Sequence, residues 1–148
     1  MKLAFLDSSV LFSAVNSPSG GSSKLFTLPK IKLVTSKVVL VETERNVRKK
    51  LLTHHLERFF TLVDKITIHD QLPDDKKIKR AKKVIAEKDA VILSEAKQAQ
   101  TSFLVTLDRK HFMTKNVANF LKPQKVLTPK ELIQLVEGSS VKVDLSSL

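Results

Sequence analysis

The fold is decided by two similar stretches, LAFLD at residues 3–7 and FLVTLD at residues 103–108. Each is a short apolar run, which is typical of a buried strand, and each ends in an aspartate. If the two strands are neighbours in a parallel sheet, Asp7 and Asp108 lie side by side at one edge of it. Like charges that close repel each other unless a cation lies between them. Alternatively, each aspartate caps the helix or turn that follows it.

The rest of the chain alternates strands with helices. Further strands are expected at residues 31–35, 66–68 and 125–127. Helical patterns separate them, over residues 8–14, 36–63, 76–87, 89–100 and 128–137. This alternation predicts an α/β fold, a parallel sheet with helices on both faces. Such sheets carry their sites beyond the carboxyl ends of the strands.

Length and composition limit the class of protein. The chain has 148 residues and no cysteine, which excludes a disulfide scaffold and a thiolate zinc site. We expect one domain over residues 1–137, ended by Gly138, and a flexible tail over residues 138–148. Residues 16–23, rich in serine and glycine, are expected to be a flexible loop. No apolar run is long enough for a signal peptide or a membrane span, so a cytoplasmic protein is expected.

The charge indicates a polyanionic partner. The chain carries 26 Lys and Arg against 15 Asp and Glu, a formal net charge of +11. Residues 76–83, KKIKRAKK, concentrate six of these cations on one predicted helix. A solvated helix face is the simplest interpretation of such a run. Mutual repulsion of so many cations nevertheless favours a partner that neutralises them, and RNA phosphate is the natural one.

Two more acids occupy unusual places. Asp89 begins a helix whose apolar residues recur at positions 92, 93, 96 and 99, so it lies on the face toward the sheet unless it is an N-cap. Glu42 follows the apolar residues 38–41, although an exposed or salt-bridged helix position is the alternative. Four carboxylates from four elements would form an oxygen-only site, which selects Mg²⁺ or Mn²⁺. Such ions serve phosphodiester hydrolysis.

Four ordered blocks resemble those of the PIN-domain ribonucleases, the family that includes the toxins of VapBC systems. The blocks are FLDSSVL at 5–11, TSKVVLVE at 35–42, KDAVIL at 88–93 and LVTLDR at 104–109, and the closing VLTPKEL at 126–132 is also similar. The resemblance extends from Met1 to about Val136. No single block is specific, because each is short and mostly apolar, but the ordered set over this length is much more so.

The resemblance implies a three-layer α/β/α fold with about five parallel strands in the order 3-2-1-4-5. It implies that Asp7, Glu42, Asp89 and Asp108 are the catalytic, metal-binding acids, and that Thr106 hydrogen-bonds to them. A small antitoxin protein and a homodimer are implied as partners beside RNA. One departure concerns Lys110, because many members carry a further acid at that position. This lysine leaves the number of metal ions open.

Other assignments fit the residues less well. A haloacid-dehalogenase phosphatase needs a second aspartate where Ser9 stands, and a receiver domain needs an acidic pair that is missing. The four histidines have no metal-ligand spacing. A surface role is expected for His111, although its position three residues after Asp108 is the alternative that would place it near the site. Two functions therefore stay open: a Mg²⁺- or Mn²⁺-dependent endoribonuclease, possibly a toxin, and a catalytically inactive RNA-binding or assembly module on the same fold.

Overall fold

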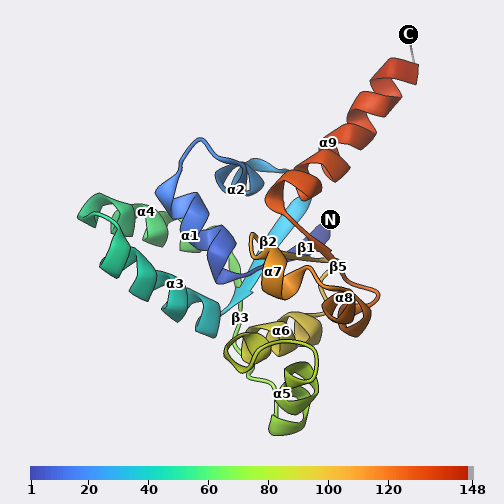
Figure 1. Cartoon of the computed structure of the whole chain (residues 1–148). Coiled ribbons are helices and arrows are strands. Elements are labelled where there is room, and N and C mark those ends of the chain that lie inside the picture. Colours follow the sequence, from blue (N-terminus) through green and yellow to red (C-terminus); the bar gives the residue numbers. More distant parts are fainter. Residues whose placement is uncertain (147–148) are drawn as a thin grey trace.

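The computed structural model describes residues 1–146, with side chains described as far as Gly138. Its centre is a five-stranded parallel sheet in the order β3-β2-β1-β4-β5 (Figure 1), which confirms the predicted α/β class and strand order. The strands are β1 (Lys2–Leu6), β2 (Ile31–Ser36), β3 (Thr67–His69), β4 (Phe103–Val105) and β5 (Lys125–Leu127). With β1 between β2 and β4, the segments that follow β1 and β4 leave the sheet at the same edge.

Helices connect the strands and cover both faces of the sheet. They are α1 (Ser8–Asn16), α2 (Gly21–Lys24), the 3₁₀ turn η1 (Leu25–Thr27), α3 (Lys37–Lys50), α4 (Thr53–Val63), α5 (Asp75–Lys82), α6 (Glu87–Ala99), α7 (Arg109–Phe112), α8 (Lys115–Leu121) and α9 (Pro129–Ser146). Figure 1 shows α1 and α4 on one side of the sheet and α5, α6 and α8 on the other. The arrangement is the expected three-layer sandwich. No helix in the described part of the chain is long and apolar enough to cross a membrane.

The core has two halves because the side chains of a strand alternate between the faces of the sheet. Ala4 and Leu6 of β1 belong to the half beneath α1 and α4. Phe5 points the other way and pairs in register with Val34 of β2 and Leu104 of β4, beneath α6 and α8. Strands buried on both faces explain why the sequence shows continuous apolar runs there.

The single helix expected over residues 36–63 is wrong, because the chain breaks between α3 and α4. Leu51 and Leu52 are both extended, and the Leu51 backbone N–H donates to the Val47 carbonyl oxygen. The apolar period continues across the break, and neither glycine nor proline marks it. The turn allows Val47 of α3 and Phe59 of α4 to pack in the same half of the core.

Other boundaries also differ from the expectations. The basic helix ends at Lys82, not at residue 87, and the loop expected over residues 16–23 already contains the start of α2. Residues 109–124, for which no element was expected, form α7 and α8. Helix α9 passes through Gly138 to Ser146, beyond the end expected at Glu137. The flexible character of residues 138–148 stays a prediction, and residues 147–148 lie outside the described part.

Candidate metal centre at the carboxyl edge of the sheet

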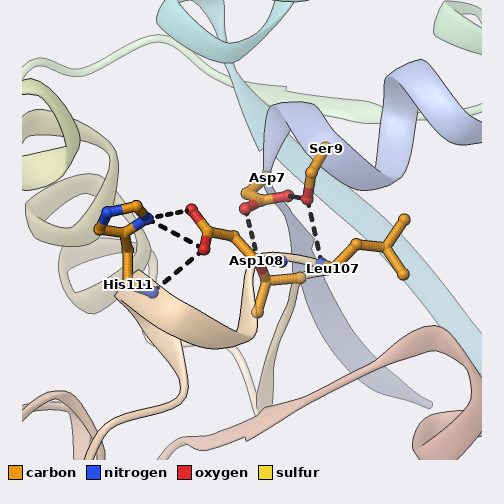
Figure 2. A network of polar contacts seen from close by, with 6 residues as sticks. Asp7, Ser9, Leu107, Asp108 and His111 are labelled. Carbon is orange, nitrogen blue, oxygen red and sulfur yellow. Dashed lines mark hydrogen bonds and ion pairs between the residues drawn. The ribbon is translucent and has the colours of Figure 1, made fainter.

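Asp7 lies directly after β1, and three neighbouring groups hold its carboxylate. It is the N-cap of α1, where Oδ1 accepts from the Val10 backbone N–H at 3.3 Å. The Ser9 hydroxyl donates to the same oxygen, and the Thr106 hydroxyl donates to Oδ2 at 2.6 Å. Figure 2 shows the Ser9 hydroxyl beside the Asp7 carboxylate. The capping role and the place at the sheet edge, which were alternatives in the sequence, therefore coexist.

Two hydroxyls connect the loop after β1 to the loop after β4. Thr106 Oγ1 accepts from the Asp108 backbone N–H at 3.0 Å while it donates to Asp7. Ser9 Oγ accepts from the Leu107 backbone N–H at 3.0 Å. The expected strand over residues 103–107 ends earlier, at Val105, because Leu107 pairs with this side chain and not with a strand. Asp108 is consequently placed by a turn and not by the strand itself.

Burial dominates the electrostatics of Asp7. The residue is only 3% exposed, and this burial raises the pKa of its carboxyl above the usual value. The hydrogen bonds from Ser9 and Thr106 favour the ionised form and act in the opposite direction, but they are the smaller effect. A cation nearby would favour the ionised form further.

Asp89, Asp108 and His111 gather into one group of potential ligands. One potential ligand atom from each of the three residues lies within 4.8 Å of the corresponding atoms of the other two. Asp108 caps α7, with Oδ1 accepting from the His111 backbone N–H at 3.0 Å. The His111 ring turns back to the same carboxylate, with Nδ1 2.9 Å from Oδ2 (Figure 2). Asp89 comes from a different element, α6, and is the third residue of that helix and not its cap.

The Asp89 carboxylate has the features expected of a metal ligand. Its Oδ2 atom is buried and has no hydrogen-bond partner in the structure. Burial raises the pKa of Asp89, Lys88 lowers it, and the neighbouring charge of Asp108 raises it. An unpartnered buried oxygen beside a second carboxylate is costly unless a cation satisfies both. The donors present, carboxylate oxygens and one imidazole nitrogen, therefore fit a divalent metal ion.

Glu42 lies apart from the group of three. It is half-buried on α3 and lines a cavity of about 500 Å³ together with Arg45, Lys88 and Ile92. The described residues show no hydrogen bond or ion pair from its side chain. Lys88 in the wall of this cavity is the neighbour of Asp89 in α6, so the cavity adjoins the acidic group. The structure thus joins Asp7 to the Asp108 loop through Thr106 and groups Asp108 with Asp89, whereas Glu42 does not belong to that group.

Sequence reasoning missed two residues of this edge. Ser9 was considered only as the residue that stands where a phosphatase needs a second aspartate, whereas its hydroxyl binds Asp7. His111 was expected to have a surface role, but its ring contacts Asp108. The Asp-x-x-His spacing could have indicated this contact. Asp108 is the N-cap of a short helix, and the residue three positions after an N-cap, here His111, lies close to the side chain of the cap. Lys110, between them, is exposed.

Glu95 was not singled out in the sequence, yet it is the most buried glutamate among the described residues. It is 6% exposed, and its Oε1 accepts from the Ser36 hydroxyl at 2.8 Å. Ser36 ends β2 and caps α3, so this contact ties α6 to the carboxyl edge of the sheet. Burial raises the pKa of Glu95 to about 7, although the hydrogen bond from Ser36 acts to lower it.

A larger cavity lies elsewhere and has different chemistry. It encloses about 930 Å³ at the amino end of the strands, between Lys2 of β1, Lys30 before β2 and Lys125 of β5. None of the described residues that line it is acidic. Because the carboxylates gather at the opposite edge, we place the candidate site there despite the smaller cavities.

The profile of the PIN domain family matches residues 4–116, which is most of the chain. The chain therefore belongs to the PIN-domain family, as its ordered acidic blocks predicted. No curated protein matches the chain significantly by sequence.

Solved structures share the fold at low sequence identity. PAE2754 from Pyrobaculum aerophilum aligns with a TM-score of 0.63 and 14% identity, over 93% of this chain and 96% of that one. VapBC2 from Rickettsia felis, solved bound to a DNA fragment from its promoter, aligns with a TM-score of 0.61 and 17% identity, over 84% and 96%. VapC20 from Mycobacterium tuberculosis, a toxin that cleaves the sarcin–ricin loop, aligns with a TM-score of 0.54 and 14% identity, over 72% and 91%. At these identities the likeness concerns the fold.

Proposed function

We propose that this chain is a divalent-metal-dependent endoribonuclease in which Asp7, Glu42, Asp89 and Asp108 hold Mg²⁺ or Mn²⁺. The observation that carries the proposal is the pair formed by Asp89 and Asp108, with the unpartnered buried oxygen of Asp89 beside a second carboxylate. Membership of the PIN-domain family supports the reaction class. Glu42 would reach the site across the gap between α3 and α6.

Hydrogen bonds from neighbouring residues would hold the metal-binding acids in place. Ser9 and Thr106 fix the Asp7 carboxylate, and the backbone N–H of His111 fixes that of Asp108. Divalent metal ions supply, when bound, the activation of a water molecule and the neutralisation of charge on the leaving oxygen. No covalent nucleophile is required, which agrees with the absence of cysteine from the sequence.

RNA as the substrate is supported by the cations around α5. Ile78 and Ala81 pack this helix against the core, so its lysines and its arginine remain outside. Among the described residues, only Lys82 of these cations forms an ion pair, with Glu87 at 3.4 Å. Helix α5 packs along α6, and its carboxyl end leads into the start of α6, where Asp89 lies. A polyanion bound along α5 would therefore approach the acids.

A small cavity beside α5 suits a phosphate or a base. It encloses about 300 Å³ between α5, α6 and α8, and its lining includes Lys77, Arg80, Lys97 and Phe120. The Lys97 ammonium lies 4.2 Å from the centre of the Phe120 ring. Cations with one aromatic ring are the usual means of binding single-stranded RNA through backbone and stacking contacts.

The toxin role, the antitoxin partner and the homodimer belong to the same proposal. Several structural neighbours come from toxin–antitoxin systems, including one from Klebsiella pneumoniae solved as a toxin–antitoxin complex. A small antitoxin that binds this chain would block the cleavage of RNA. Light scattering of the purified chain at several concentrations tests the dimer.

The second candidate is a catalytically inactive RNA-binding or assembly module. Lys110 favours it, because this exposed cation stands in α7 directly beside the group of ligands. A lysine there competes with a metal ion for the carboxylates or binds a phosphate in its place. This module would bind RNA in a salt-sensitive way without any need for metal.

Cleavage assays on a labelled single-stranded RNA separate the two candidates. The endoribonuclease predicts cleavage with Mn²⁺ or Mg²⁺, none with EDTA, and a loss of about 100-fold or more in Asp7→Asn and Asp89→Asn. Asp64→Asn is the matched control, since Asp64 is an exposed carboxylate at the end of α4. Equal cleavage by all variants, or no cleavage under any metal, would contradict the nuclease.

Binding measurements on the same RNA test the basic helix. The slope of log K against log salt is negative for the wild-type complex. Lys79→Gln/Lys83→Gln should make it less steep, by about 0.7 for each phosphate that these lysines neutralise. Lys49→Gln/Lys65→Gln removes two exposed cations elsewhere and should leave the slope unchanged. A uniform effect of both double variants would show that net charge alone, and not α5, binds RNA.

A further inference from the structure

The side chain of His111 is oriented toward the proposed metal site, although His111 is not one of the four acids proposed to bind the metal. Its Nδ1 atom lies 2.9 Å from Oδ2 and 3.1 Å from Oδ1 of Asp108, so it faces both oxygens of the carboxylate. The ring is 33% exposed and the Asp108 side chain 29%, so the contact stands at the rim of the site. A histidine with no function in the site would be expected to turn toward water, whereas this one turns toward the acids.

The His111 ring is also within reach of Asp89. One ring nitrogen of His111 and one carboxylate oxygen each from Asp89 and Asp108 all lie within 4.8 Å of one another. Among the described residues, buried Asp89 Oδ2 has no hydrogen-bond partner, and the charge of Asp108 raises the energy of the ionised Asp89 carboxylate. One ion among these three residues would separate the like charges and offer Asp89 a cationic partner. It would accept the lone pair of His111 Nδ1 once the proton that Nδ1 shares with Asp108 has moved to Nε2 or to water.

We infer that His111 is a ligand, through Nδ1, of the divalent ion held by Asp89 and Asp108, so that the centre is a mixed nitrogen–oxygen site. This inference rests on the proposed function, which supplies the metal ion, and adds to it the identity of a ligand. Mg²⁺ binds oxygen ligands and water, and Mn²⁺ also favours oxygen, but the affinity of a nitrogen–oxygen site for first-row divalent ions begins with Mn²⁺ and rises along the series. The site therefore selects Mn²⁺ over Mg²⁺ more strongly than carboxylates alone would.

The competing role for His111 is to position Asp108 by a hydrogen bond without touching the metal. Both roles predict that its removal weakens metal binding, so affinity alone does not separate them. A direct spectroscopic signature does, because a nitrogen bound to Mn²⁺ modulates the electron spin echo of the ion and a nitrogen bonded only to a carboxylate does not.

The experiment records the ¹⁴N modulation of Mn²⁺ bound to the full chain and to three variants. Wild type should show the modulation of a coordinated imidazole, and His111→Ala and His111→Gln should lose it. His111→Gln retains a hydrogen-bond donor for Asp108, which protects the fold and the positioning role. His69→Ala removes an exposed histidine of β3 and should keep the signal.

Titration calorimetry provides the second readout. The preference for Mn²⁺ over Mg²⁺ should fall by at least about tenfold in His111→Gln, while His69→Ala matches wild type. Mn²⁺ that binds wild type without ¹⁴N modulation, or modulation that persists in both His111 variants, overturns the inference and leaves the nuclease proposal intact. Failure of wild type to bind Mn²⁺ at all overturns both.

Discussion

Glu95→Gln should abolish a large part of the dependence of this protein's stability on pH. Glu95 is a buried carboxyl on α6 whose only described polar partner is the Ser36 hydroxyl, at 2.8 Å. Burial holds its pKa at about 7 in the folded chain, against 4.5 for an ordinary glutamate. The folded protein therefore keeps Glu95 protonated through a range of pH in which the unfolded chain has already lost that proton.

The sign follows from proton counting. Between about pH 4.5 and pH 7 the folded state binds more protons than the unfolded state, so the free energy of unfolding falls as the pH rises. The contribution of Glu95 is fully present below this range and lost above it. A shift from 4.5 to about 7 corresponds to roughly 3 kcal/mol. Asp7 and Asp89, whose pKa values burial also raises, act with the same sign, so the wild-type decrease includes their shares.

Urea unfolding of wild type and Glu95→Gln at about pH 5 and about pH 8 measures the effect. The amide keeps a carbonyl oxygen for Ser36 and cannot ionise. We therefore expect near-equal stabilities at the lower pH and a more stable variant, by up to about 3 kcal/mol, at the higher pH. Glu57 is an exposed glutamate of α4, so Glu57→Gln should differ from wild type by the same amount at both pH values. A stability difference between Glu95→Gln and wild type that is the same at both pH values would refute the reasoning.

Three further substitutions test the supports of the site and the core. Thr106→Val removes the hydroxyl that donates to Asp7 at 2.6 Å, so calorimetry should show metal affinity about 10–100-fold lower, and unchanged affinity would contradict the positioning role. Gln100→Gly should raise the free energy of unfolding by roughly 0.5–1 kcal/mol in thermal melts, because Gln100 ends α6 with a φ of 52°, and a lower melting temperature would argue against strain there. Leu93→Ala opens a cavity in the core under α6 and should cost about 2–5 kcal/mol in urea unfolding, whereas a loss below about 1 kcal/mol would mean that the site collapses freely.

The sheet and two of the acids at its edge could be predicted because short, continuous stretches of the sequence identify the strands. Apolar runs that end in Asp7 and near Asp108 identify neighbouring strands on their own, and both strands lie side by side in the structure. The break at Leu51 could not be predicted, because the apolar period runs on through it and only packing against the core requires the turn. Helix α7 is too short to leave a periodic pattern, so only the spacing of His111 three residues after Asp108 indicated that the two side chains could meet.

The burial of Glu95 could not be predicted from the sequence for a different reason. Its neighbours on α6 form a regular apolar stripe, and a glutamate between them looks like an ordinary solvent-facing residue. Its burial depends on Ser36, 59 residues earlier, whose hydroxyl ends β2 and caps α3. No local pattern contains that contact. Glu42 shows the reverse case: its apolar surroundings predicted a site residue, and among the described residues no hydrogen bond or ion pair connects its side chain to the other acids.

The raised pKa values divide the buried acids into two kinds. Asp7 and Asp89 lie at the sheet edge with hydroxyl donors, an orphaned oxygen and a second carboxylate around them, so a divalent cation would lower both pKa values and return the free energy lost on burial. Glu95 has a single hydroxyl partner and stands outside the group of ligands formed by Asp89, Asp108 and His111. Its burial destabilises the ionised form with no cation to offset it.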